Sequence, residues 1–253
     1  MTDEFITQIN EDLRLIQRRG DLSFGTDAYL LGAFVRPVPG GRAAEFGGGS
    51  GVVSLLCAAR HRFARILCAE IQPDLAELIR RNAALNGLES VVEPVLADVR
   101  ELTVRDTEGE LHAVFSNPPY FRAGTGKVNE SPGMRAARRE ENGAIRDFCS
   151  AAGRLLRWGG LFTVVYRPER LTELLYSLRA AGLEPKRIVF VHPSSDAPPS
   201  LVLAEAKKGA GEGLTFARPL IVYRSAADSV YTEDMQAVYD TFSMEHLFQT
   251  PAR

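Results

Sequence analysis

The sequence RAAEFGGGSGVVSLLCAAR occupies residues 42–60 and contains three local signals in succession. Arg42–Phe46 predicts a buried strand, Gly47–Gly51 predicts a turn with little side-chain bulk, and Val52–Arg60 predicts a helix. A strand, a glycine turn and a helix begin a nucleotide-binding α/β unit, where bare backbone lets a ligand approach the helix N-terminus. The alternative is a glycine-rich turn with a purely structural role.

Two acidic residues follow the next predicted strands. Arg65–Glu70 predicts a strand that ends in Glu70, about 20 residues beyond the glycines, where an acid is placed to accept hydrogen bonds from both ribose hydroxyls of an adenosine. A helix over Pro73–Leu85 and a strand over Val91–Leu96 then lead to Asp98. In this layout Asp98 can hold the amino group of the adenine, the alternative being a surface acid.

The apolar strand predicted at Leu111–Phe115 ends abruptly at the motif NPPY, residues 117–120. Pro118 and Pro119 fix two φ angles and donate no N–H, so they hold the motif stiffly at the tip of the strand. The Asn117 side chain and the Pro118 carbonyl can accept both hydrogens of an exocyclic amine, while Tyr120 stacks on its ring. An ordinary strand-ending turn is the alternative.

Position in the sheet connects these motifs. The first and fourth strands of a doubly wound sheet flank its topological switch point, so their C-terminal tips share one crevice. The glycine turn and the NPPY motif are therefore predicted to face each other.

A long basic connection follows NPPY and has no hydrophobic period. Its length is typical of a lid or a binding loop, and cations at the rim of a base pocket contact phosphates. A solvated flexible loop is the alternative. The candidate substrate-binding residues are Phe121, Arg122, Lys127, Arg135, Arg138 and Arg139.

The rest of the chain predicts one α/β domain over residues 1–253. It consists of a helical extension and cofactor lid (1–34), a core (35–225) and a tail (226–253). The extension contains an amphipathic helix over 3–16 and an apolar helix after Thr26 or Asp27, with Asp27 as a possible N-cap. Further helices are predicted at 147–156, 170–181 and 231–248, and strands at 161–166, 187–191, 201–206 and 214–223, of which 201–206 pairs antiparallel.

Composition sets the limits on function. Hydrophobic residues make up 45% and charged residues 25% of the chain, as in globular proteins with an ample core. The formal net charge of −2 argues against a surface that grips nucleic acid everywhere, although it permits a local basic face.

No metal site or export signal is predicted. The cysteines are expected to be small core residues in a reducing compartment, and the four histidines share no metal-ligand spacing. The N-terminus is acidic and lacks an apolar signal segment, so we expect a cytoplasmic protein.

Together these motifs resemble a known family. EFGGGSG at Glu45–Gly51 fits the form ExGxGxG, whereas a dinucleotide fingerprint would need a glycine at Val52. With Glu70, the ADV at Ala97–Val99 and NPPY, the chain resembles the S-adenosylmethionine-dependent class I amino-methyltransferases. More narrowly, FGTDAYLLGAF at residues 24–34 and NPPYF before a basic glycine loop are similar to the bacterial tRNA(Val) adenosine-37 N6-methyltransferases.

The resemblance implies a seven-stranded, mostly parallel Rossmann-like sheet with helices on both faces and a C-terminal antiparallel strand. It implies S-adenosylmethionine as cofactor, S-adenosylhomocysteine as product, a tRNA substrate, no membrane, no metal, and a monomer or weak dimer. The implied catalytic residues are Asn117, Pro118, Pro119 and Tyr120. The implied cofactor-binding residues are Asp27, Glu45, Phe46, Gly47, Gly49, Gly51, Glu70, Ile71, Asp98, Val99 and Asn117.

Three other functions stay open on these motifs. NPPY also occurs in glutamine N5-methyltransferases acting on release factors and in guanine N2-methyltransferases acting on ribosomal RNA. The chain has neither a separate N-terminal helical bundle nor a duplicated methyltransferase-like half, which argues against both without deciding. A cofactor-binding scaffold that has lost catalysis is disfavoured by the intact NPPY.

Overall fold

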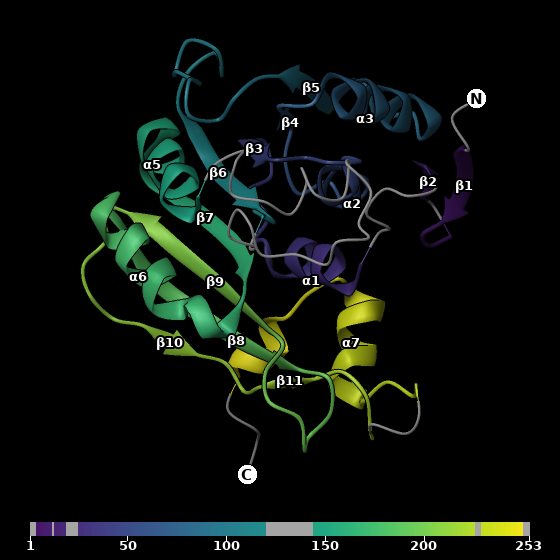
Figure 1. The fold of residues 1–253 in the computed structure, drawn as a ribbon, viewed down its shortest axis with the longest axis vertical. Coiled ribbons are helices and arrows are strands. Elements are labelled where there is room, and N and C mark those ends of the chain that lie inside the picture. The colour runs from purple at the N-terminus through teal and green to yellow at the C-terminus, as the bar shows by residue number, and fades with distance from the viewer. Residues whose placement is uncertain (1–3, 12, 19–24, 120–143, 226–228, 250–253) are drawn as a thin grey trace, which may run out of the picture.

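The protein is a three-layer α/β structure with one large sheet between two layers of helices (Figure 1). This computed structural model describes residues 4–11, 13–18, 25–119, 144–225 and 229–249. The helices are α1 (Thr26–Phe34), α2 (Val52–Ala59), α3 (Pro73–Leu85), α5 (Ile145–Leu155), α6 (Leu171–Ala180) and α7 (Glu233–Thr241). The strands are β1 (Glu4–Gln8), β2 (Arg14–Arg18), β3 (Arg42–Phe46), β4 (Arg65–Glu70), β5 (Val92–Leu96), β6 (Leu111–Ser116), β7 (Leu156–Tyr166), β8 (Leu183–His192), β9 (Leu201–Lys208), β10 (Thr215–Phe216) and β11 (Leu220–Ile221).

The large sheet confirms the predicted fold class. Its strand order is β10-β8-β9-β7-β6-β3-β4-β5, with β11 also paired to β8. The seven strands β3 to β9 have at least five residues each, and β9 alone among them runs antiparallel to its neighbours. The antiparallel strand therefore lies inside the sheet, between β7 and β8.

Both faces of the sheet are covered, because its central strands are apolar on both sides. One face packs against α1, α2 and α3, and the other packs against α5 and α6. The predicted bounds of α3 are confirmed at both ends, where Pro73 occupies the first turn and Gly87 follows with a φ of 66°.

The amphipathic helix predicted over 3–16 is wrong. These residues form an antiparallel hairpin of β1 and β2. The helical spacing counted Phe5 and Ile6 as part of an apolar face, yet these side chains are 41% and 58% exposed. The buried side chains are instead Leu13 and Leu15, which alternate as strand residues do.

The hairpin is held by side chains of α3 that lie far away in sequence. The Asn86 amide accepts from the Arg14 N–H at 2.9 Å and donates to the Arg14 carbonyl at 2.7 Å. One helical turn earlier, the Asn82 amide makes the same pair of bonds to Ile16, at 2.7 and 3.3 Å. The two amides thus satisfy β2 as a neighbouring strand would, which makes a strand the favoured state for this segment.

Several predicted strands have different bounds: the strand predicted over 187–191 extends over the whole of β8, Leu183–His192, and two other differences have a local cause. The strand predicted over 214–223 is divided into β10 and β11, and Pro219 between them has no N–H to donate to β8. The strand predicted over 161–166 begins at Leu156, because Gly159, with a φ of 78°, lets β7 continue through an irregularity in its pairing with β6.

The tail packs on α1. Tyr239 of α7 stacks on Tyr29 with ring centroids 5.3 Å apart, and Phe242 meets Tyr29 edge-on at 5.2 Å. The Tyr29 hydroxyl donates to the Tyr239 carbonyl at 3.0 Å. These contacts fix α1 against the C-terminal helix.

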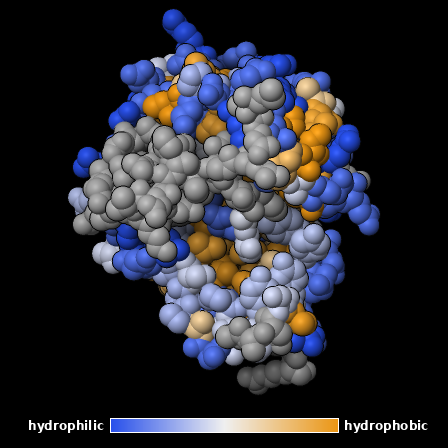
Figure 2. Space-filling view, turned by 45° about the vertical axis from the view of Figure 1, so that its right-hand side comes forward, coloured by the Kyte–Doolittle hydropathy of each residue, from blue (hydrophilic) through white to orange (hydrophobic). Residues whose placement is uncertain are grey.

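The surface seen in Figure 2 is mostly hydrophilic, and its hydrophobic atoms lie at the upper left and upper right of the view and in the floor of a hollow near its centre. Cys57, Cys68 and Cys149 are free and buried, as predicted. None of the helices among the described residues has the length and apolar character needed to cross a bilayer.

Candidate active site

Adjacent strands bring the two sequence motifs together. β3 and β6 are parallel neighbours, and Phe46 pairs with Ser116 at their carboxyl ends. The Ser116 hydroxyl donates to the Phe46 carbonyl at 2.8 Å and ties the two tips together. Gly47 and Asn117 therefore leave the sheet side by side, which confirms the predicted juxtaposition. Ser116 was missed by sequence reasoning, although a polar residue at the end of an apolar strand is a signal.

The glycine turn needs glycine for two reasons. Gly47, Gly49 and Gly51 have φ values of 71°, 58° and 79°, which L-residues with side chains rarely adopt. A Cβ on Gly48 would lie 2.3 Å from the Cys68 sulfur. The turn is consequently a bare backbone surface over the end of β4, as a close-fitting ligand requires.

Glu70 holds this turn from the tip of β4. One carboxylate oxygen accepts from the Gly49 N–H at 2.9 Å, and the other accepts from the Gln72 N–H at 2.9 Å. Each oxygen can accept a further hydrogen bond. Glu70 is thus oriented beside the turn and can serve ribose hydroxyls, the role predicted for it.

Glu45 lies beneath the turn. Its side chain is 2% exposed, and one carboxylate oxygen accepts from the Ser54 N–H at 2.9 Å and the Ser54 hydroxyl at 2.5 Å. Burial raises the pKa of Glu45 to about 7, against the lowering effect of the Ser54 bonds. These bonds tie the end of β3 to the first turn of α2, and the predicted cofactor contact of Glu45 stays a prediction.

Asp98 has a neighbour that the sequence reasoning missed. Its carboxylate accepts from the Arg100 Nε and from the Arg100 N–H, each at 2.9 Å. The Arg100 guanidinium holds the pKa of Asp98 below its usual range. An adenine amino group would share this carboxylate with Arg100, so the predicted role of Asp98 also stays a prediction.

Three predicted cofactor residues lie along the same edge. Phe46 and Val99 are buried, while Ile71 is half-buried directly after β4. Ile71 therefore offers exposed surface at this edge, whereas Phe46 is fully buried and its predicted cofactor contact stays a prediction.

Asn117 is half-buried, and its Nδ2 donates to the Asp27 carboxylate at 3.0 Å. Asp27 does not supply the N-cap of α1, because Gly25 occupies that position with no side-chain bond. Pro118 is buried and Pro119 half-buried after Asn117. The remaining predicted residues, Tyr120, Phe121, Arg122, Lys127, Arg135, Arg138 and Arg139, lie outside the described residues.

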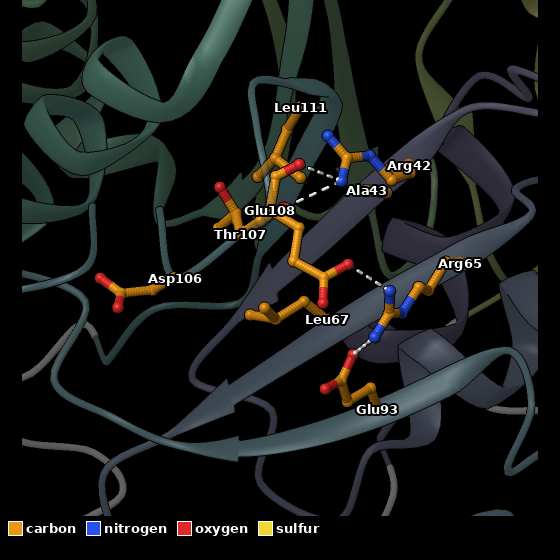
Figure 3. Close-up of a pocket in the computed structure, with 9 residues that line it drawn as sticks. All are labelled: Arg42, Ala43, Arg65, Leu67, Glu93, Asp106, Thr107, Glu108 and Leu111. Atoms are coloured by element: carbon orange, nitrogen blue, oxygen red, sulfur yellow. Dashed lines mark hydrogen bonds and ion pairs between the residues drawn. The ribbon is translucent and has the colours of Figure 1, made fainter. Parts of the chain in front are cut away.

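A second hollow lies at the opposite, amino-terminal edge of the sheet (Figure 3). Its volume of about 30 Å³ admits roughly one water molecule. Arg65 bridges Glu93 and Glu108 across it, with both N–O distances 2.6 Å. This hollow is too small for a nucleoside. In the part of the chain that the structure describes, no cluster of His, Cys, Asp or Glu side chains is arranged to hold a metal ion.

Comparisons with known proteins agree with this geometry. Residues 41–120 match the family model of the TRM5/TYW2 methyltransferase domain. A tRNA1(Val) (adenine(37)-N6)-methyltransferase of Phocaeicola vulgatus is 29% identical over 188 residues, which cover 74% of this chain and 77% of that protein.

Solved structures share the fold. A predicted O-methyltransferase from Agrobacterium tumefaciens superposes with a TM-score of 0.69 at 23% identity, covering 86% of this chain and 97% of that one. TYW2 of M. jannaschii, solved with AdoMet, gives 0.56 at 16% identity, covering 82% and 86%. The chain thus has the fold of class I methyltransferases, and over about three quarters of its length it resembles the tRNA1(Val) (adenine(37)-N6)-methyltransferase of Phocaeicola vulgatus.

Proposed function

We propose that this protein methylates the N6 amino group of an adenine in tRNA, with adenosine 37 of tRNA(Val) as the target. The observation that carries this proposal is the pairing of Phe46 with Ser116, which sets Asn117 beside Gly47. Amide and carbonyl acceptors for an exocyclic amine then border the cofactor turn. The relative from Phocaeicola vulgatus bears the name of this activity.

The cofactor is S-adenosylmethionine, and the residues at the turn fit it. A Cβ on Gly49 would meet nothing within 4 Å, so the turn borders open space there and its bare backbone is available to the methionine part. Glu70 presents an oriented carboxylate for the ribose. Asp98, which follows β5, presents the carboxylate that we assign to the adenine amino group. When bound, the cofactor supplies an electrophilic methyl group on positively charged sulfur.

The chain's own contribution is to position the amine and shape its charge. The adenine amino nitrogen is a poor nucleophile because its lone pair is delocalised into the ring. Hydrogen bonds from its two hydrogens to the Asn117 Oδ1 and the Pro118 carbonyl would localise the lone pair on nitrogen and aim it at the methyl group. The nitrogen becomes acidic as the new N–C bond forms, and its proton leaves to water without a dedicated base.

Residues after the NPPY tip are assigned to contacts with the RNA substrate. We assign base stacking to Tyr120 and phosphate contacts to the basic loop after it, on their sequence alone. We also propose a cytoplasmic location, where tRNA is available, and a monomer or weak dimer.

The test is methyl transfer from labelled S-adenosylmethionine to tRNA(Val) transcripts. We expect label in RNA, found as N6-methyladenosine after digestion to nucleosides, and its loss when adenosine 37 is replaced by guanosine. A parallel reaction with a release factor serves as the protein substrate. Protease-sensitive label there, with none in RNA, would contradict the proposal.

The variant Asn117→Ala tests the site itself. Removing one electrostatic stabiliser of this kind lowers kcat about 10²-fold or more. Cofactor affinity, measured by calorimetry, should change little, because Asn117 acts on the amine. Tyr176→Ala is the control, since Tyr176 is 76% exposed on α6 and away from the crevice. An equal loss of cofactor affinity and kcat in Asn117→Ala would contradict this division of roles.

A further inference from the structure

Asp27 connects the start of α1 with the NPPY motif across 90 residues of sequence. One carboxylate oxygen accepts from the Ala28 N–H at 2.9 Å, which fixes the rotamer of Asp27. The other oxygen accepts from the Asn117 Nδ2 at 3.0 Å. Gly25 leaves space for this arrangement, because a Cβ there would lie 2.5 Å from the Asp27 Oδ1.

This bond determines which way the Asn117 amide points. An ionised carboxylate can only accept hydrogen bonds, so the group that faces Asp27 is the NH2 end of the amide. The carbonyl end, Oδ1, is then directed away from Asp27. Without such a neighbour an asparagine amide can turn by 180° and present its NH2 where an acceptor is needed.

The bond also changes the strength of the amide as an acceptor. A negative charge on the NH2 end polarises the amide and increases the electron density on Oδ1, since hydrogen bonds in series reinforce one another. The same charge lies one amide away from the nitrogen that becomes positive during methyl transfer. Its electrostatic effect therefore favours the transition state over the ground state.

We propose that Asp27 is a positioning residue, which orients and polarises the Asn117 amide so that Oδ1 accepts from the target amine. This inference rests on the proposed function of Asn117. It assigns Asp27 to the amine side of the site, in place of the cofactor contact that the sequence predicted.

The helix that carries Asp27 is suited to this role. The residues Ala28 to Phe34 are buried, and Tyr29 is held by α7 through its hydroxyl and its ring. A side chain on a packed helix keeps its geometry better than one on a loop. Asp27 is thus supported by the same contacts that attach the tail.

The test is a double-mutant cycle of Asp27→Ala and Asn117→Ala, with kcat and cofactor Kd measured for each variant. We expect Asp27→Ala to lower kcat about tenfold or more, as for a lost charge-assisted hydrogen bond, with the cofactor Kd unchanged. In the Asn117→Ala background the same change should cause no further loss, because Asp27 acts through Asn117. Independent losses in the two backgrounds, or a weakened cofactor Kd, would overturn the inference.

Asp74→Ala is the matched control. Asp74 is also a first-turn acid, on α3, and its side chain is 86% exposed with Arg18 3.9 Å away. The Asp74→Ala variant should leave kcat unchanged. Its free energy of unfolding reports the stability that is lost when any acid is removed from the first turn of a helix. Asp27→Asn adds a graded case, since it keeps an acceptor and removes the charge.

A second measurement does not depend on turnover. In protein labelled with ¹⁵N-asparagine, the Asn117 side-chain resonance is assigned by its loss in Asn117→Ala. Asp27→Ala should shift both amide protons and accelerate their exchange with water. Unchanged resonances would overturn the inference even if tRNA is methylated. Changed resonances support the orientation of the amide even if the substrate proves to be another amine.

Discussion

The two edges of the parallel sheet hold their carboxylates in opposite ways. At the amino-terminal edge, Arg65 bridges Glu93 and Glu108, and Arg42 donates to the Glu108 carbonyl at 2.7 Å (Figure 3). At the carboxyl edge, Glu45 and Glu70 accept from backbone N–H groups, and no lysine or arginine among the described residues pairs with either.

The difference separates a structural edge from a binding edge. The carboxylates paired with Arg65 are neutralised, and a second arginine, Arg42, donates to the backbone carbonyls of Thr107 and Glu108 and so holds the loop after Thr103. At the binding edge no arginine among the described residues neutralises Glu70, and a carboxylate held by neutral N–H groups suits a ligand that carries a sulfonium and an ammonium group. Asp98, with Arg100, is the exception at the binding edge.

The buried charge of Glu45 should make stability depend on pH. Its pKa is raised from 4.5 to about 7, so the folded state binds the proton more tightly than the unfolded state. The resulting stabilisation is complete below pH 4.5 and is lost as pH rises through 7, by about 3 kcal/mol. Glu45→Gln removes this loss. The free energy of unfolding of the variant, relative to the unmodified protein, should therefore rise over this range in urea titrations.

Glu77→Gln gives a control of opposite sign. Arg80 lowers the pKa of the Glu77 carboxyl, so its contribution is present at neutral pH and lost as pH falls. Relative to the unmodified protein, this variant should become less stable as pH rises. A Glu45→Gln difference that stays constant with pH would show that the buried carboxyl is not the titrating group.

Glu70→Ala should weaken cofactor binding about tenfold or more, because it removes a charged acceptor for the ribose and releases the Gly49 N–H. Calorimetry with S-adenosylmethionine measures the change. Glu108→Ala is the same substitution at the amino-terminal edge and should leave the cofactor Kd unchanged. Equal effects of the two substitutions would remove the distinction between the edges.

The elements that the sequence predicts well are those with local causes. The α3 bounds follow from Pro73 and the Asn86-Gly87 stop, and the glycine turn follows from its positive φ angles. Neighbouring strands then bring Asn117 to the turn by topology alone. These inferences need no knowledge of side-chain contacts.

What the sequence could not predict depends on distant contacts. The β1–β2 hairpin depends on Asn82 and Asn86, more than 60 residues away, and its own apolar spacing favours a helix. The bond between Asp27 and Asn117 has the same origin. Arg100 is close in sequence to Asp98, but an arginine after a strand is usually solvated, so its contact leaves no signal.

The smallest effect is expected from Arg65→Ala. Arg65, Glu93 and Glu108 are 41%, 43% and 64% exposed at their side chains, and solvent screens pairs of this kind. The free energy of unfolding should fall by about 1 kcal/mol or less, measured in urea, with kcat and the cofactor Kd unchanged. Glu93 and Glu108 remain partly solvated after the change, so neither is left as a buried charge. A loss of cofactor binding in Arg65→Ala would mean that the amino-terminal edge is coupled to the crevice through β4, and the separation of the two edges would not hold.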